Sequence, residues 1–273
     1  MSAGFRRRLA ERVSRWLALG LLFVVAVAVW QLLVWLEVTS RFILPPPAEV
    51  AREIGRMVVN LLQGGFVLEN LWITIQEVLI GFALAVVFGV GLGAAVAETA
   101  YGRNVVLPYL VALNAAPKVA FAPIFVAWLG FGIWAKVAMA AFIAFFPLMV
   151  DTAAGLATVD AERVKLFRSL RASRAQMFFK LKLPNALPFV FAGLKTASVL
   201  AVVGAIVGEF LGGGAGLGQL IRIAGSQLRI ARVFAFVTIL SVAGYLFYAL
   251  VAWVERRVVF WRSPELVPTT TTM

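Results

Sequence analysis

A series of apolar stretches, each long enough to cross a lipid bilayer, constrains this chain more than any other feature. A helix rises about 1.5 Å per residue, so roughly 20 apolar residues cross about 30 Å of hydrocarbon. Such stretches lie at about residues 16–36, 68–97, 105–128, 134–154, 187–211 and 234–254. They predict an all-α integral membrane protein whose residues 16–254 form a single domain of six transmembrane helices.

The segments between these stretches carry further signals. Residues 45–47 are three prolines, which break a helix, and residues 48–62 that follow predict a short amphipathic helix outside the membrane. The third stretch, residues 105–128, is interrupted by three prolines, an asparagine and a lysine. A lone lipid-facing helix would not tolerate these interruptions. We therefore expect irregular backbone within this span.

The distribution of basic residues predicts the orientation. Sixteen of the 25 Lys and Arg residues lie in residues 1–15, the loop at Arg103, residues 163–182 and the tail, residues 255–273. Cytoplasmic loops carry an excess of Lys and Arg, so residues 1–15 and 255–273 are expected to be cytoplasmic. A signal peptide would have a shorter apolar region and a small-residue cleavage site, and we expect the first span to be retained. The same bias explains the net charge of +12 without a nucleic-acid partner.

The composition also limits the chemistry. The chain has no Cys and no His, so thiolate nucleophiles, His-based triads and Cys/His zinc sites are excluded. The sequence AGLKTAS at residues 192–198 lacks the first glycine of a P-loop. We therefore expect no catalytic residue, no metal site and no enzyme activity in this chain.

The loop at residues 156–186 is strongly basic. Asp160 is a candidate N-cap for a helix whose apolar stripe consists of Val164, Phe167 and Leu170. Ala172 and Ser173 are expected to turn the chain into a second short helix, over residues 175–183, that ends as Pro184 and Pro188 approach. The loop is predicted to be a cytoplasmic helical hairpin. The alternative is a basic loop that only faces anionic lipid headgroups.

This loop resembles the coupling loop of the membrane subunits of bacterial ABC importers, whose pattern is E-A-A, three residues, G, nine residues, I-x-L-P. The spacing matches on this chain. Lys165, Leu166 and Phe167 stand at the E-A-A positions and Arg171 at the glycine, while Leu181, Lys182, Leu183 and Pro184 form the I-x-L-P element. The resemblance implies that residues 160–184 dock on an ATPase. The residues at the E-A-A and glycine positions differ from the pattern, and these four differences affect the expected strength of docking.

The resemblance continues through LPPPAEV, NAAPKVAFAPIFVAWLGFG, AFIAFFPLMVDTAAGL, LPNALPFVFAGLK and VVGAIVGEFLGGGAGLGQLI. These segments are similar to permeases that import sulfonates, taurine, nitrate and heteroaromatic vitamin precursors. The resemblance implies a type I importer permease in the bacterial inner membrane, paired with a second permease copy as a homodimer. It also implies two cytoplasmic ATPase subunits, which bind ATP and Mg, and an extracytoplasmic substrate-binding protein.

Ionisable groups at membrane depth are candidates for the translocation path. The polar and proline-containing segment before Lys118 adds two more candidates for the path, Asn114 and Pro117. Lys118, which follows them, either lines the path, snorkels to the interface or pairs with an acidic residue. That residue would be Asp151 or Glu209, and both are also path candidates. Glu209 either acts as a gate or simply reaches interfacial water. Lys195 is expected to be structural.

Two other functions remain open at this stage. An ATPase-independent secondary transporter or channel would use the same ionisable residues without the hairpin. A membrane scaffold would bind a cytoplasmic partner without any solute flux. For a permease, the expected substrate is a small nutrient of the sulfonate, nitrate, thiamine-precursor pyrimidine or riboflavin type.

Overall fold

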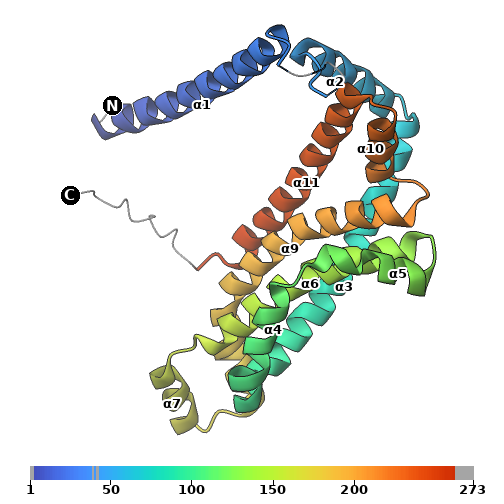
Figure 1. Cartoon of the computed structure of the whole chain (residues 1–273). Coiled ribbons are helices and arrows are strands. Elements are labelled where there is room, and N and C mark those ends of the chain that lie inside the picture. Colours follow the sequence, from blue (N-terminus) through green and yellow to red (C-terminus); the bar gives the residue numbers. More distant parts are fainter. Residues whose placement is uncertain (1–2, 39, 41–42, 262–273) are drawn as a thin grey trace. The chain divides into compact units, whose positions relative to one another are not determined.

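The computed structural model describes residues 3–38, 40 and 43–261, and these residues form helices and connecting turns without a strand. Figure 1 shows the helices. Their bounds are α1 Ala3–Trp35, α2 Pro47–Leu62, α3 Phe66–Glu98, α4 Leu107–Asn114, α5 Ala122–Leu129, α6 Ile133–Ala157, α7 Ala161–Ser169, α8 Arg174–Met177, α9 Leu183–Gly212, α10 Leu217–Ser226 and α11 Ile230–Val258. Two π-helical turns, η1 (Gly102–Val106) and η3 (Phe178–Lys182), and one 3₁₀ turn, η2 (Lys118–Phe121), complete the described elements.

The expectation of a multi-spanning all-α protein is confirmed. Four helical segments are long and apolar enough to cross a membrane: Phe66–Glu98, Ile133–Ala157, Arg174–Gly212 and Ile230–Val258. Gly102–Asn114 and Lys118–Leu129 are long and apolar enough only as a pair, and they are bent by 84°, which is the geometry of a broken span or a re-entrant loop. The expected first span lies in α1, whose apolar part within the described residues, Gly20–Trp35, is shorter than a full span. The predicted tail lies outside the described residues from residue 262 onward.

The chain divides into two units. The first contains residues 1–66 and 220–239, and the second contains residues 67–219 and 240–273. In the first unit, α2 matches the predicted amphipathic helix and begins at Pro47, where the missing N–H of proline is tolerated. Trp30 Nε1 donates to the Pro45 carbonyl at 3.1 Å. The helix α10 was not predicted, because it lies between the two apolar stretches at residues 187–211 and 234–254.

Small residues build the core of the second unit, where α6 packs along α9. One core cluster contains the buried alanines Ala85, Ala140, Ala144, Ala197, Ala201 and Ala205. A Cβ atom added at Gly204 would lie 2.6 Å from Ala140 Cα, and one added at Gly208 would lie 2.7 Å from Lys136 Cα. The two helix backbones therefore approach one another closely at these glycines.

Residues 160–184 form the predicted helical hairpin at one end of the second unit (Figure 1). Asp160 caps α7 by accepting a hydrogen bond from the Glu162 backbone N–H at 2.9 Å. Ser173 caps α8 through a reciprocal capping box with Gln176. The predicted N-cap and the turn are thus present.

The expected end of the second hairpin helix near Pro184 is wrong. The helical backbone continues from Arg174 through Gly212. Pro184 falls in the first turn of α9, directly after the π-helical turn η3, and Pro188 is accommodated inside α9. The N–H that proline lacks is not needed as a donor in the first turn of an α-helix. Pro184 therefore fits directly after η3 without interrupting the helical backbone.

Arg171 occupies the hairpin turn in a left-handed conformation, with φ of 56°. Its N–H bonds to the Arg168 carbonyl at 2.9 Å, and the Ala172 N–H bonds to the Phe167 carbonyl at 3.0 Å. These two bonds form a Schellman motif, in which the left-handed residue is usually glycine. Arg171 therefore keeps the glycine-type turn and bears its conformational strain.

Replacing Arg171 with glycine is expected to stabilise the hairpin by about 1 kcal/mol, because glycine adopts positive φ without steric cost. Arg168→Gly is the matched control: it removes the same charge from the right-handed part of α7 and should destabilise by about 0.5–1 kcal/mol. Hydrogen exchange of residues 161–177 measures both effects. Equal changes in the two variants would show that charge, not backbone conformation, dominates at Arg171.

Candidate functional site

A cluster of buried ionisable groups lies where α3, α6 and the end of α9 meet. Lys136 Nζ on α6 donates to Glu77 Oε1 on α3 at 2.9 Å and to the Ala215 carbonyl at 2.6 Å. Glu77 and Glu209 are 0% exposed, and Lys136 is 3% exposed. The cluster is therefore sequestered from solvent within the second unit.

Glu209 on α9 anchors the segment that follows this helix. Its Oε1 accepts a hydrogen bond from Thr74 Oγ1 at 2.6 Å, and its Oε2 accepts one from the Gly218 backbone N–H. Thr74 Oγ1 in turn accepts from the Leu217 N–H at 2.9 Å. Asn70 Oδ1 accepts from the Gly216 N–H at 2.7 Å. Side chains of α3 and α9 thus fix the backbone of residues 216–218.

The cluster revises the interpretation of Glu209. Because Glu209 is fully buried, it does not reach interfacial water. No pattern in the sequence connects Glu209 with Thr74, Glu77 or Lys136. Lys136 carried a signal that could have been used, because a lysine in an apolar span requires a buried partner or access to water.

A second group of residues surrounds the break in the bent span. Lys118 Nζ donates to the Asn114 carbonyl at 2.6 Å and to Asn114 Oδ1 at 2.9 Å. It bonds Asn114 rather than Asp151 or Glu209, so the ion pair, which was one of the three alternatives for Lys118, does not form. Pro117 begins the 3₁₀ turn and permits the bend. Lys118, Asn114 and Pro117 therefore lie together, while Glu209 belongs to the other cluster.

Aromatic rings continue from Lys118 along η2, α5 and α6. The ammonium group lies 5.5 Å from the centroid of the Phe146 ring. Phe146 contacts Phe142, and Phe142 contacts Phe121 and Phe125, with centroid distances of 5.2–5.4 Å. These four rings, Phe121, Phe125, Phe142 and Phe146, are called the aromatic row below. The row and Lys118 combine flat apolar surfaces with one cation.

Asp151 lies apart from both groups. It is half-buried on α6, and its Cβ would lie 3.0 Å from a Cβ atom added at Gly193 on α9. No other described residue makes a hydrogen bond or ion pair with its carboxyl group. The five path candidates therefore occupy three separate places in the second unit.

The hairpin presents an apolar surface that differs from the predicted one. Leu166 is 57% exposed and Leu170 is 70% exposed, whereas Val164 and Phe167 are half-buried. The basic surface of the hairpin consists of the exposed side chains of Lys165, Arg168 and Arg171. Ser173 is exposed and caps α8, and Ala172 beside it is half-buried. The predicted stripe of Val164, Phe167 and Leu170 is thus divided between the hairpin interior and its surface.

The base of the hairpin is connected to two other helices. Lys182 Nζ contacts both carboxylate oxygens of Glu98, at 2.8 and 2.9 Å, which joins η3 to the end of α3. Asn185 Nδ2 donates to Thr158 Oγ1 at 3.4 Å, beside the end of α6. Leu181 is buried, while Leu183 and Pro184 are half-buried. Movement of the hairpin would therefore act on α3 and α6 as well as on α9.

Comparison with known families identifies the kind of protein that has this arrangement. Residues 85–260 match the family described as "Binding-protein-dependent transport system inner membrane component". The chain belongs to this family. It is the membrane permease component of a binding-protein-dependent transport system, and it is not an enzyme.

Relatives of this permease include two proteins named for heteroaromatic compounds. The formylaminopyrimidine transport permease protein ThiX of Halalkalibacterium halodurans is 34% identical over 90% of this chain and 96% of its own length. The riboflavin transport system permease protein RibX of Chloroflexus aurantiacus is 33% identical over 91% of this chain and 92% of its own length. A putative aliphatic sulfonates transport permease protein, SsuC of Bacillus subtilis, is 29% identical over 94% of this chain and 92% of its own length.

The fold of the permease is that of solved ABC importers. An inward-facing structure of the MetNI methionine ABC transporter aligns with a TM-score of 0.60 and 19% identity, over 71% of this chain and 96% of the matched chain. The type I importer fold predicted from the sequence is therefore confirmed.

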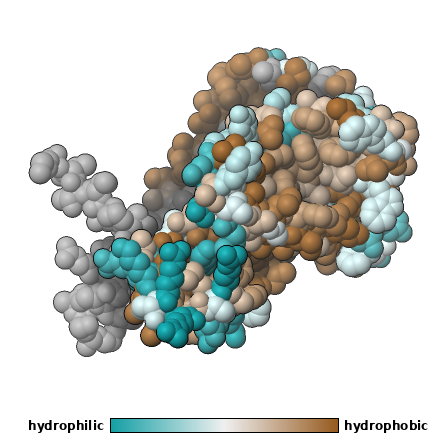
Figure 2. All heavy atoms as spheres, turned by 90° about the horizontal axis from the view of Figure 1, so that it is seen from below, coloured by the Kyte–Doolittle hydropathy of each residue, from teal (hydrophilic) through white to brown (hydrophobic). Residues whose placement is uncertain are grey.

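The surface of the permease is consistent with an integral membrane protein. Figure 2 views the molecule from the hairpin end and shows hydrophilic side chains gathered in part of this face, with apolar side chains over much of the rest. Many exposed apolar side chains occur on helices that are long enough to span, such as Val87, Phe88 and Leu92 on α3. Such a surface is stable in contact with lipid.

Proposed function

We propose that this chain is a permease subunit of an ABC importer in the bacterial inner membrane, coupled to separate cytoplasmic ATPase subunits. The family match supports the transport role, and the hairpin of residues 160–184 supports the coupling. A second copy of the chain completes the translocation path as a homodimer, and an extracytoplasmic binding protein delivers the substrate. ATP and Mg bind to the partner ATPase.

The exposed tip of the hairpin supports docking on an ATPase. Leu166 and Leu170 project from α7 among exposed basic residues, which suits an apolar groove with an acidic rim. The second arm of the hairpin continues into α9 as one helical segment, Arg174–Gly212. Nucleotide-driven movement of the ATPase would then be transmitted along α9 and, through Lys182 and Glu98, to α3.

The surroundings of Lys118 support one class of substrate. The aromatic row offers flat apolar surfaces for stacking, and the ammonium group of Lys118 offers a hydrogen-bond donor to a carbonyl or ring nitrogen. A planar heteroaromatic nutrient of the pyrimidine or flavin type has both features. The names of two relatives agree with this class, and a sulfonate or nitrate would use Lys118 but not the rings.

Replacing Leu166 with aspartate is expected to abolish ATP-dependent uptake by proteoliposomes that contain the permease, its ATPase and its binding protein. A buried carboxylate in the docking groove would oppose assembly, because an unpaired charge is costly to desolvate. Ala161→Asp is the matched control. It adds the same charge at an exposed position in the first turn of α7, where a negative charge is favourable, and should retain uptake.

The same assay separates the alternatives. Uptake by the permease without any ATPase would favour a secondary transporter or channel, and partner binding without uptake would favour a scaffold. The wild-type complex should import a heteroaromatic compound in preference to a sulfonate or nitrate. Preferred import of an anion would contradict the substrate class and leave the permease function intact.

A further inference from the structure

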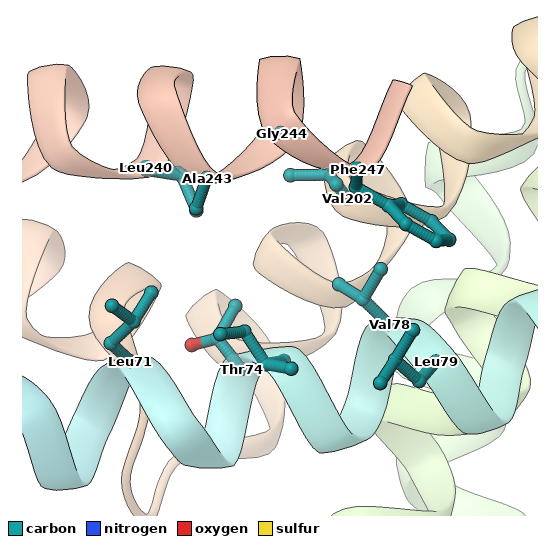
Figure 3. A pocket seen from close by; sticks show the side chains of 10 residues that line it. Leu71, Thr74, Val78, Leu79, Val202, Leu240, Ala243, Gly244 and Phe247 are labelled. Atoms are coloured by element: carbon teal, nitrogen blue, oxygen red, sulfur yellow. The ribbon is translucent and has the colours of Figure 1, made fainter. Parts of the chain in front are cut away.

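The buried cluster contains two carboxyl groups but only one ammonium group. The charged groups that act on Glu77 are Glu209 and Lys136. Apolar side chains border the α3 segment that carries the cluster: Figure 3 shows Leu71, Val78, Leu79, Val202 and Phe247 around Thr74, whose hydroxyl is the one oxygen among the labelled side chains. Two ionised carboxyl groups here would leave an uncompensated negative charge in an apolar environment, which is strongly unfavourable.

Hydrogen bonds distinguish the two carboxyl groups. Both oxygens of Glu209 lie against donors. Oε2 accepts from the Gly218 N–H, and Oε1 lies 2.6 Å from Thr74 Oγ1, a shorter contact than the 3.1 Å between the same hydroxyl and the Asn70 carbonyl. A carboxyl group with donors at both oxygens is best matched by its ionised form, which only accepts. Glu209 therefore has the surroundings of a carboxylate.

Glu77 has different surroundings. Its Oε1 accepts from Lys136 Nζ, while its Oε2 is buried and no described donor reaches it. Glu209 nevertheless lies close to Glu77, because it bonds Thr74, one turn earlier on the same face of α3. Two ionised carboxylates would repel at this separation, whereas a proton on Glu77 would make it a donor for Glu209.

We propose that Glu77 is a proton-binding site, and that its neutral carboxylic acid donates a hydrogen bond to the Glu209 carboxylate. With this proton bound, Glu77 is neutral. The positive charge of Lys136 then balances the negative charge of Glu209, and the cluster has no net charge. The proton then connects α3 to α9 in the same way that Lys136 connects α3 to α6. This assignment rests on the buried contacts of this chain and holds whether or not the chain imports the proposed substrate.

The proton site also stabilises the segment after α9. Gly216 has φ of 128° and lies against the Glu209 carboxylate, and the Gly218 N–H bonds to the same group. Lys136 holds the Ala215 carbonyl from the opposite direction. A proton on Glu77 keeps Glu209 ionised and available as an acceptor for this backbone. Glu77 is thus a positioning residue for residues 215–218.

Infrared spectroscopy of the purified, full-length protein at neutral pH tests the assignment directly. The wild type should show the C=O stretch of a buried carboxylic acid, shifted in D₂O, and Glu77→Gln should lose this band. Asp151→Asn removes a half-buried carboxyl group elsewhere on α6 and should retain the band. A wild-type spectrum without the band, or loss of the band in Asp151→Asn alone, would overturn the proposal.

Thermal unfolding in detergent provides a second, independent measurement. Glutamine at position 77 can donate to Glu209 and accept from Lys136, so Glu77→Gln should unfold at the wild-type temperature. Glu209→Gln places an amide donor against Thr74 or the Gly218 N–H, and should lower the unfolding temperature and the yield of folded protein several-fold. The reverse order of the two variants would place the proton on Glu209, and equal losses would indicate two ionised carboxylates.

Discussion

Replacing Lys136 with methionine is expected to lower the free energy of unfolding by about 3–5 kcal/mol, which is the cost of removing one member of a buried ion pair. The variant leaves the buried carboxyl groups of α3 and α9 without their cation, and the Ala215 carbonyl without its donor. Chemical denaturation of the purified protein in detergent measures the loss. Little folded protein should remain at the temperature at which the wild type is stable.

Lys195→Met is the matched control. Lys195 forms an ion pair with Glu255 at 2.7 Å, but the two side chains are 25% and 23% exposed, so about 1 kcal/mol or less should be lost. The double variant Lys136→Met/Glu209→Gln removes both buried charges and should lose less than the sum of the single variants. Equal losses for Lys136→Met and Lys195→Met would show that the buried cluster contributes no more than a surface pair.

Gly204→Ala is expected to destabilise the second unit by about 1–3 kcal/mol through overpacking. The added Cβ would lie 2.6 Å from Ala140 Cα and 2.8 Å from the Met139 carbonyl oxygen. Both atoms belong to the backbone of α6, so no side-chain rotation can relieve the clash. The helices α6 and α9 would have to separate, and denaturation in detergent would show a lower midpoint.

Gly91→Ala provides the control for helix propensity. Gly91 lies within α3, and a Cβ atom added there has no neighbour within 4 Å. Alanine is favoured over glycine in a helix interior by about 0.5–1 kcal/mol, so this variant should be neutral or slightly more stable. A wild-type midpoint for Gly204→Ala would contradict the close approach of α6 and α9.

Local and periodic properties of the sequence predicted much of the fold. The long apolar stretches located α3, α6, α9 and α11, because the thickness of a bilayer sets a minimum length that composition alone reveals. Asp160 predicted the start of α7, since an N-cap depends only on neighbouring backbone groups. The glycine-like position of Arg171 also followed from the family pattern, and its left-handed φ agrees with that position.

Features that depend on contacts between distant residues were not predicted. Glu77 and Lys136 are separated by 59 residues in the sequence, and no local pattern relates them. Pro184 was expected to end a helix because proline preferences describe isolated helices. The π-helical turn before it changes which N–H group is needed, and that depends on how α9 continues into the core. Likewise, periodicity predicted which residues of α7 share an apolar face. It could not predict that Leu166 is exposed, because this depends on how the two arms of the hairpin pack together.

The π-helical turn η3 allows the second arm of the hairpin and α9 to form one helical segment with one extra residue between them. A π-helical turn accommodates one residue more than the corresponding α-helical turn. Each residue of an α-helix turns the chain by about 100°, so an extra residue in a regular helix would rotate everything before it by nearly a third of a circle about the α9 axis. The π-helical turn absorbs this residue locally. Leu166 and Leu170 therefore keep nearly the direction that they would have with one residue fewer, and the hairpin tip is insulated from a one-residue change of length in this turn.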